Sequence, residues 1–547
     1  MESIDIAIAM LGAVLVSGAL VRVIPWPVPL PLLQIALGFL IAGVFKVGVK
    51  LDPDVFFLLF LPPLLFLDGW HIPKDLLRRD KLGIFQLSVV LVVLTVVGAG
   101  YAIHWMIPSM PLAVAFALAA IISPTDPVAV AGITRRLTVP RRIISVLEGE
   151  ALFNDASGLV AFRIAIAAAM TGAFSLSSAV MSFLWVAGAG LATGALVTAA
   201  VMFLRDGFTR RFGEEPRSEV LLSLLIPFGA YFLAEHVGAS GILAAVAAGV
   251  TMSYAELSGR VSAFARMQRH SVWDMVQFIL NGIMFVLLGE QLPRVFRAAA
   301  GTMAQAGNDA WLLPVYALAI WLMLAVLRLA CIFVSVRLAR LVRNATPPPE
   351  ARATPRIMLA LTLGGVRGAV TLAGVMTLPL LLPGGDAFPA RDLAIFLAAA
   401  VIIISLICAS IGMPRLLKGI EPSQSSPHQR QREVARQAAH RAAVNRVSVI
   451  LDAQREEDSS QEARRYMDVV DQVLAGLHEP AGPVADVADA ADDGRKRVRR
   501  EVERTMRRAA IEASREAIYK LAREREISDE VARDMVRLLD LEEVRLS

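Results

Sequence analysis

Long apolar stretches dominate the first 417 residues of the chain. Thirteen of them are long enough, or nearly so, to cross a bilayer as helices, which takes about 20 residues each. They cover residues 4–23, 29–48, 54–70, 82–105, 112–132, 143–170, 179–204, 219–237, 239–255, 272–290, 311–336, 356–381 and 392–415. Because a bilayer offers no hydrogen-bonding partners to the backbone, such stretches fold as helices. The sequence therefore predicts an all-α polytopic membrane protein with about thirteen transmembrane helices. A hydrophobic content of 56% excludes an ordinary soluble protein.

The basic residues of the connecting loops predict the orientation of the chain. Alternate loops hold twenty Lys and Arg residues, whereas the intervening loops hold five. The basic set comprises loops 71–81, 133–142, 205–218, 256–271 and 337–356. Basic loops face the cytoplasm by the positive-inside rule. We therefore expect a multi-pass protein of the cell (plasma) membrane with its N-terminus outside and its C-terminal tail in the cytoplasm.

The composition changes near Leu417, where the chain becomes rich in Arg, Glu and Ala. Two charged helical segments are expected at 429–478 and 495–545, separated by a break rich in Gly, Pro, Ala and Asp. No Gly-rich phosphate-binding loop follows a predicted strand. We predict a transmembrane domain at 1–417 and a helical cytoplasmic tail at 418–547 that regulates or oligomerises, with an unidentified ligand or partner. A solvated, partly disordered tail is the alternative.

Carboxylates lie inside two neighbouring apolar stretches. Asp126 belongs to the fifth, and Glu150 and Asp155 belong to the sixth, where Asn154 precedes Asp155. A charged side chain at the centre of a bilayer costs roughly 2.5–3.5 kcal/mol on insertion scales, and its default interpretation is an ion or proton pathway. Asp68, which ends the third stretch, is either a funnel residue on that pathway or an interfacial carboxylate.

Proline and glycine interrupt two of the predicted spans, each beside a charged residue. Asp126 lies in the sequence SPTDP at 123–127, and Arg367 lies in GGVRG at 364–368. Proline removes a backbone donor, and glycine lets a helix unwind. Paired broken helices in two halves of a chain are typical of transporters built from inverted repeats, with the site near the midplane. The interruptions therefore predict two discontinuous helices and inverted repeats.

Two arginines deep in predicted spans require carboxylate partners. Arg328 and Arg367 stay charged when buried, and Glu150, Asp126 and Asp155 are all candidate partners. A proton carrier must be an unpaired carboxylate, since pairing stabilises the ionised form. This argument favours Asp155 as the carrier.

The oxygen-bearing residues near the first interruption suit a hard monovalent cation. Thr125, Asp126, Asn154 and Asp155 offer hydroxyl, amide and carboxylate oxygens, the ligands that Na⁺ prefers. One carboxylate that binds either H⁺ or a cation makes exchange obligatory. We expect no cofactor beyond the transported ions, no nucleic acid and no enzymatic activity, because no nucleophile–base or metal-hydrolase pattern is present. A cation channel and an organic-solute carrier remain alternatives, although no selectivity-filter loop is evident.

Five motifs carry a resemblance to a known family. They are FLPPLLFLDGW at 60–70, ISPTDPVAV at 122–130, EGEALFNDA at 148–156, GILAAVAAGVTMSY at 241–254 and GGVRGAVTLA at 364–373. Together they resemble the monovalent cation:proton antiporters, in the sodium/proton exchanger branch that includes bacterial NhaP-type antiporters. The resemblance covers about the first 415 residues and leaves the tail uncovered.

The resemblance implies a homodimer with a dimerisation domain and a mobile core domain, working by an elevator-like mechanism. It implies an ion site where the broken fifth and twelfth helices cross. In this branch an Asn-Asp pair, here 154–155, replaces the Asp-Asp pair of the electrogenic branch, which implies electroneutral, one-for-one exchange. Asp155 is then the essential ion- and proton-binding carboxylate, and Na⁺ is bound at Asp155, Asp126 and Thr125.

The resemblance also assigns the remaining charges. Glu150 is a structural acid paired with a buried arginine, with Arg328 as the first candidate, and Arg367 compensates the negative ends of the half-helices. Some members have serine at the position of Ala151, so the ion preference stays open. We expect exchange of Na⁺, and also Li⁺, for H⁺ in pH and sodium homeostasis, with K⁺/H⁺ exchange as the alternative.

Overall fold

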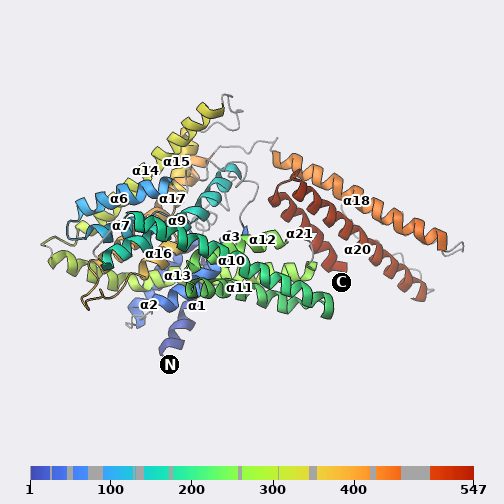
Figure 1. Cartoon of the computed structure of the whole chain (residues 1–547), viewed down its shortest axis with the longest axis horizontal. Coiled ribbons are helices and arrows are strands. Elements are labelled where there is room, and N and C mark those ends of the chain that lie inside the picture. Colours follow the sequence, from blue (N-terminus) through green and yellow to red (C-terminus); the bar gives the residue numbers. More distant parts are fainter. Residues whose placement is uncertain are drawn as a thin grey trace. The chain divides into compact units, whose positions relative to one another are not determined.

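The computed structural model describes residues 2–24, 28–45, 53–71, 90–126, 130, 141–171, 176–256, 261–305, 307–343, 354–418, 427–457 and 493–546. These residues form seventeen helices (Figure 1). Their β structure is limited to an isolated bridge between Leu381 and Ala387. The all-α prediction is confirmed for this part of the chain.

Every predicted span contains a helix. The continuous ones are α1 (Glu2–Val23), α2 (Leu30–Phe45), α3 (Pro53–His71), α6 (Leu91–Met106), α9 (Arg141–Thr171), α10 (Leu176–Phe212), α11 (Pro216–His236), α12 (Gly241–Glu256), α13 (Ala263–Gln305), α14 (Leu312–Arg343) and α17 (Arg391–Leu417). By length and apolar composition, five helices of the described residues are able to cross a membrane: α10, α11, α13, α14 and α17. The full number of thirteen spans stays a prediction.

The fifth and twelfth spans are interrupted where the sequence predicts. Helix α7 (Leu112–Ile122) ends before Ser123, and residues 123–126 are not helical. The continuation of this span lies outside the described residues apart from Val130. The twelfth span consists of α15 (Pro355–Leu363) and α16 (Ala369–Met376), with the glycine-containing segment 364–368 between them. Whether the two halves of the chain form inverted repeats stays a prediction.

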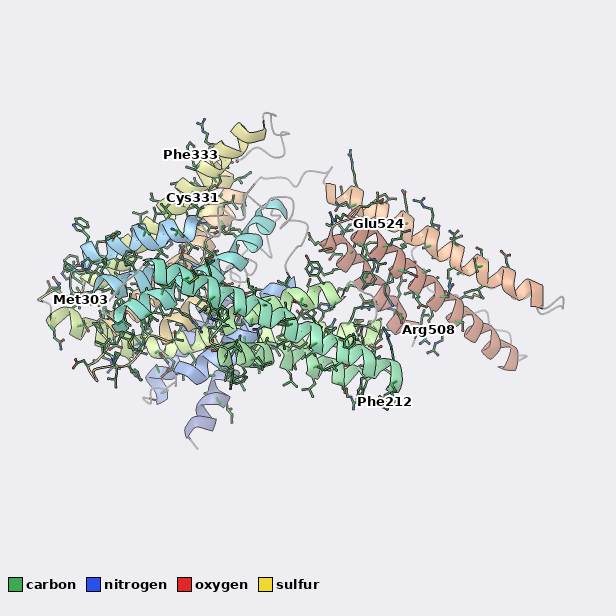
Figure 2. The ribbon with its side chains drawn as sticks, viewed as in Figure 1. Phe212, Met303, Cys331, Phe333, Arg508 and Glu524 are labelled. Carbon is green, nitrogen blue, oxygen red and sulfur yellow. The ribbon has the colours of Figure 1, made fainter. Side chains whose placement is uncertain are left out.

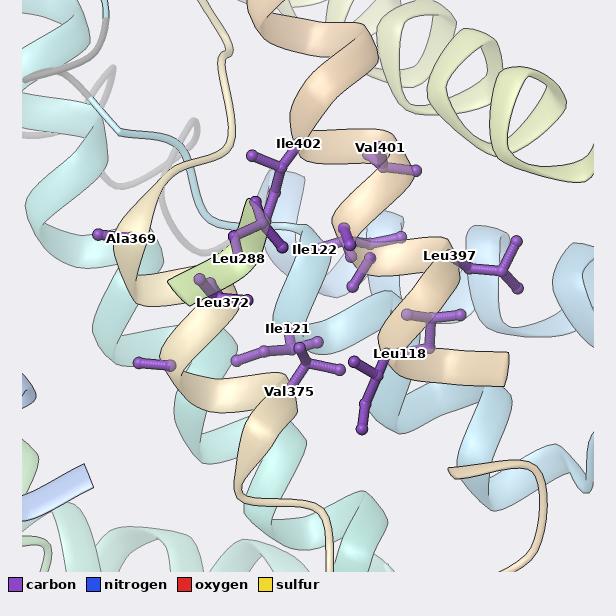
Figure 3. Close-up of a cluster of buried hydrophobic side chains, with 14 of the residues drawn as sticks. Leu118, Ile121, Ile122, Leu288, Ala369, Leu372, Val375, Leu397, Val401 and Ile402 are labelled. Atoms are coloured by element: carbon purple, nitrogen blue, oxygen red, sulfur yellow. The ribbon is translucent and has the colours of Figure 1, made fainter. Parts of the chain in front are cut away.

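The buried core surrounds these interrupted spans. Figure 3 shows side chains of α7, α16 and α17 converging, among them Leu118, Leu372 and Val401, with Leu288 of α13 beside them. In addition, α7 packs against α6 and α9, and α14 packs against α6, α15 and α17. The broken segments are thereby held by continuous helices on several sides.

Close helix crossings join several of the other helices. A methyl group at Gly38 of α2 would overlap the Val286 carbonyl of α13, and one at Gly289 would overlap the Ile35 carbonyl. Helices α3 and α12 meet in the same way at Gly69 and Gly249. Small residues allow backbones in a membrane to approach this closely. The crossings fix α13 against α2, and α12 against α3.

Large apolar side chains also project away from the protein. Phe212 and Phe333, labelled in Figure 2, are exposed, whereas Met303 is buried. Exposed apolar side chains on long apolar helices are typical of a lipid-facing surface.

The chain divides into two compact units. The first contains residues 1–206, 222–253 and 272–423, and the second contains 207–221, 254–271 and 424–547. The tail helices of the second unit are α18 (Pro427–Glu457), α20 (Asp493–Glu524) and α21 (Asp529–Leu546). The expected helical residues 458–478 and the break after them lie outside the described residues.

The second unit has its own apolar core and a buried charge cluster that includes Asp540. Ala435, Ile518 and Val531 pack together in the core. Asp540 of α21 accepts hydrogen bonds from Arg266 Nε (2.9 Å) and Nη2 (2.6 Å) at the start of α13. Arg515 Nη2 of α20 lies 3.0 Å from the same carboxylate. Within this unit, α20 and α21 therefore meet the start of α13 at this charge cluster.

Candidate functional site

The two helix interruptions touch each other. The Asp126 N–H donates to the Val366 carbonyl at 2.7 Å. Arg367 Nε donates to the Ile122 carbonyl at the end of α7 (3.0 Å), and its Nη1 donates to the Gly365 carbonyl after α15. Helix ends leave carbonyls unpaired and carry partial negative charge, which a guanidinium satisfies. The buried Arg367 thus lies against the ends of both half-helices.

Glu150 is fully engaged with one arginine. Arg328 Nη2 donates to Glu150 Oε2 at 2.8 Å, Nη1 contacts Oε1, and Nε donates to the Leu361 carbonyl at 3.1 Å. Both side chains are 2% exposed. This bidentate pair joins α9, α14 and α15, and it decides among the arginine partners that the sequence left open for Glu150.

Asn154 contacts the first interruption. Its Nδ2 donates to Thr125 Oγ1 at 2.9 Å, and both residues are buried. The second amide atom, Oδ1, is buried without a hydrogen-bond partner among the described residues. Asn154 therefore orients the Thr125 hydroxyl and holds α9 against residues 123–126.

A small, partly open cavity lies beside the two interruptions. Its lining comes from α3, the interruption after α7, α9, α13 and the start of α16: Leu64, Asp68, Pro124, Thr125, Asp126, Asp155, Gln277, Asn281, Gly368, Ala369, Val370 and Thr371. The structure thus brings together four of the predicted site residues, Asp68, Thr125, Asp126 and Asp155. The lining does not include Asn154, Glu150, Arg328 or Arg367.

Asp155 differs from Glu150 in its surroundings. It is 5% exposed, and the hydrogen bonds and ion pairs of the described residues include none to its carboxylate. An ionised group that is buried without a counter-charge is strongly destabilising. A proton or a cation at Asp155 would remove this cost.

The aspartates do not form a preassembled metal centre. Within the described ranges, no group of three or more His, Cys, Asp or Glu side chains is arranged to hold a metal ion. The wall of the cavity supplies hydroxyl, amide and carboxylate oxygens instead. Such a lining suits an ion that enters and leaves.

Two lining residues, Gln277 and Asn281, were not predicted from the sequence. Both lie in the span expected at 272–290, and the signal was present, because two amides four residues apart share one face of a helix. Which face meets the cavity depends on the packing of α13.

Arg163, eight residues after Asp155 on α9, also has a partner in another helix. Its Nη2 donates to Glu235 Oε1 of α11 at 3.0 Å, and this oxygen accepts from the Gly241 N–H at the start of α12. The two side chains are 37% and 36% exposed. They form a partly exposed link between α9 and the α11–α12 pair.

The sequence comparisons identify the family to which this fold and site belong. The profile of the family described as sodium/hydrogen exchanger, transmembrane, matches residues 7–419. The chain belongs to this family. It is therefore an integral membrane protein of a transporter family.

Individual relatives extend this likeness. An Escherichia coli K12 protein named as an uncharacterized Na⁺/H⁺ exchanger, YjcE, is 38% identical to this exchanger over 551 residues, covering 100% of this chain and 99% of that protein. A Bacillus pumilus sodium, potassium, lithium and rubidium/H⁺ antiporter is 44% identical over 422 residues, covering 76% of this chain and 61% of that protein. The likeness to the Escherichia coli protein includes the tail.

The fold is also similar to a solved structure. The sodium proton antiporter MjNhaP1 from Methanocaldococcus jannaschii aligns with a TM-score of 0.57 at 20% identity, covering 75% of this exchanger and 100% of that chain. At this identity the likeness concerns the fold alone.

Proposed function

We propose that this exchanger carries Na⁺, and also Li⁺, against H⁺, because both ions compete for the carboxylate of Asp155. The observation that carries the proposal is the contrast between two acids on α9. Glu150 is bound by Arg328, whereas Asp155 lines the cavity and has no hydrogen bond or ion pair to its carboxylate among the described residues. A paired acid stays ionised, while an unpaired acid is able to bind a proton or a cation in turn.

The other residues of the site have supporting roles. Thr125 and Asp126 supply oxygens to the cation, and Asn154 orients the Thr125 hydroxyl. Because Asn154 is neutral, one carboxylate exchanges one H⁺ for one cation, and the cycle moves no net charge. Asp68 attracts cations into the cavity by its charge.

The two helix groups move relative to each other in this proposal. The interrupted helices and α9 carry Asp126 and Asp155, while α3 and α13 supply the opposing lining. Alternating access follows when one group shifts past the other in an elevator-like motion, with the chain as a homodimer in the plasma membrane. The N-terminus then lies outside and the tail, in a regulatory role, lies inside. Such exchange serves pH and sodium homeostasis.

K⁺/H⁺ exchange is the second candidate. Two Bacillus relatives, 44% and 41% identical, are named for sodium, potassium, lithium and rubidium. The same carboxylate mechanism holds for either cation, since the ligands are all oxygens.

The test is cation-induced dissipation of an imposed pH gradient in everted membrane vesicles. Na⁺, Li⁺ and K⁺ are added in turn to vesicles containing the wild type or Asp155→Asn. We expect the wild type to respond to Na⁺ and Li⁺ and the variant to respond to none, because an amide binds no exchangeable proton. A response to K⁺ alone would change the substrate and keep the mechanism. Undiminished exchange in Asp155→Asn, present at normal levels, would remove the proposed site.

A further inference from the structure

Helix α13 contributes two neutral amides to the same cavity as Asp155. Gln277 and Asn281 are four residues apart on one face of this helix, and both are half-buried. The helix also packs closely against α2, because the backbone at its Gly289 lies against the Ile35 carbonyl. The amides therefore lie on a helix of the cavity wall that is separate in sequence from both interruptions.

These amides have no hydrogen-bonding role in the packing of the residues that the structure describes. The hydrogen bonds of the described residues include none from the side chain of Gln277 or Asn281. By contrast, Asn154 donates to Thr125. A polar side chain within a membrane helix is unfavourable unless it finds a partner. Both amides are therefore available to whatever occupies the cavity.

Amide oxygens perform a task that the carboxylates do not. A cation entering from water must exchange its hydration oxygens for protein oxygens, and discrimination among cations depends on the number and field strength of those oxygens. The aspartates attract a cation by its charge, and because all monovalent cations carry the same charge, this attraction does not distinguish among them. Neutral oxygens at fixed positions favour one ionic size over another, and they hold no proton that competes with the cation.

We propose that Gln277 and Asn281 are specificity-determining ligands, whose amide oxygens replace water around the cation and set the order of preference among Na⁺, Li⁺ and K⁺. The inference rests on the proposed exchange at Asp155 and adds the element that discriminates among its cations. It places discrimination on α13 and proton competition on α9. The two properties are then separable by mutation.

The experiment compares Gln277→Met and Asn281→Leu, which keep the side-chain size and remove the amide, with the wild type. Gln291→Met is the matched control, since Gln291 lies half-buried on the same helix outside the cavity lining. The concentrations of Na⁺, Li⁺ and K⁺ that half-maximally dissipate a pH gradient are measured in everted vesicles. We expect each cavity variant to raise these half-maximal concentrations by up to about tenfold. The factor should differ among the three cations. Gln291→Met is expected to match the wild type for all three cations.

The inference would be overturned if the double variant, Gln277→Met with Asn281→Leu, had the same half-maximal concentrations as the wild type for all three cations. A wild type that exchanges none of the cations would instead remove the underlying function. If the apolar variants fail to accumulate in the membrane, Gln277→Asn and Asn281→Gln take their place. These move the amide oxygen by one methylene, so an unchanged order of cations would overturn the inference equally.

Discussion

At the residue scale, Asn154 and Asp155 are neighbours with different roles: the neutral Asn154 holds Thr125, and Asp155 lines the cavity. Asn154 is buried, it donates to Thr125, and it precedes the carboxylate that lines the cavity. In the proposed mechanism its neutrality makes the exchange electroneutral, since only Asp155 then changes its charge state during the cycle. Replacing the amide with an acid tests this directly.

Asn154→Asp should make exchange generate current. A second carboxylate adds one negative charge beside Asp155, so more than one proton is exchanged per cation and net charge moves. The hydrogen bond to Thr125 then needs the hydroxyl to donate instead of accept. Cation jumps on solid-supported membranes measure the current, which should be near zero for the wild type and clear for the variant. An active variant without current would refute this role of Asn154.

The Glu150–Arg328 pair should be structural. Removing one member of a buried ion pair typically costs about 3–5 kcal/mol, because it leaves the other charge without compensation. We therefore expect Glu150→Gln and Arg328→Met each to lower the melting temperature of the detergent-solubilised protein. The double variant should be destabilised less than the sum of the two. Additive losses would mean that the two side chains are not coupled.

The contact between the two interruptions determines the site at the scale of the elements. The backbone of Asp126 is bonded to Val366, and Gly368 lies against the Asp126 side chain. A methyl group at Gly368 would overlap this carboxylate. A glycine is therefore required at position 368, because the Asp126 side chain lies too close to its backbone for any larger residue.

Gly368→Ala should reduce exchange by about tenfold or more, which corresponds to about 1.4 kcal/mol. Asp126 must shift to accommodate the methyl group, and the cavity wall shifts with it. The rate of pH-gradient dissipation is the measurement. Gly229→Ala on α11 is the control, because the structure shows no atom within 4 Å of its added methyl group. Equal rates in the two variants, at equal amounts in the membrane, would contradict the account.

The two helix interruptions were predictable from the sequence, because the residues that cause them lie within the interrupted segments. Pro124 and the glycines at 364 and 365 interrupt a helix wherever it lies, so both interruptions could be placed in advance. The pairing of charged side chains on different helices could not be predicted in this way. Three carboxylates were candidates for Arg328, and only the packing of α9 against α14 and α15 brings Glu150 to it.

The extent of α13 shows a second limit of sequence-based prediction. Hydropathy predicts a span at 272–290, whereas the helix runs over Ala263–Gln305. Polar residues at its ends lower the mean hydropathy without ending the helix. The amides at 277 and 281 were visible in the sequence, but the cavity that gives them a role is a property of the packed helices.

At the scale of the whole molecule, the tail is joined to a membrane helix by a buried charge cluster. Arg266 and Asp540 are 4% and 5% exposed, and they connect α13 with α21. This contact lies within the second unit, where it holds α21 against the first residues of α13.

Weakening this cluster should alter regulation and preserve transport. Asp540→Ala leaves Arg266 buried without its bidentate partner, so we expect faster limited proteolysis of the tail. Removal of residues beyond about 420 should likewise keep exchange and shift its pH response, and Asp540→Ala should shift it in the same direction. Arg432→Gln, which removes an exposed ion pair with Asp534, is the matched control. Loss of cation binding in the truncated protein would contradict a regulatory tail.

Competition between H⁺ and the cation at one carboxylate is the central claim, and proton release tests it most directly. Na⁺ is added to the purified, weakly buffered protein while the pH is recorded. The account predicts release of about one proton per chain, saturating with cation binding, and no release from Asp155→Asn. Cation binding without proton release, or undiminished release from the variant, would contradict it.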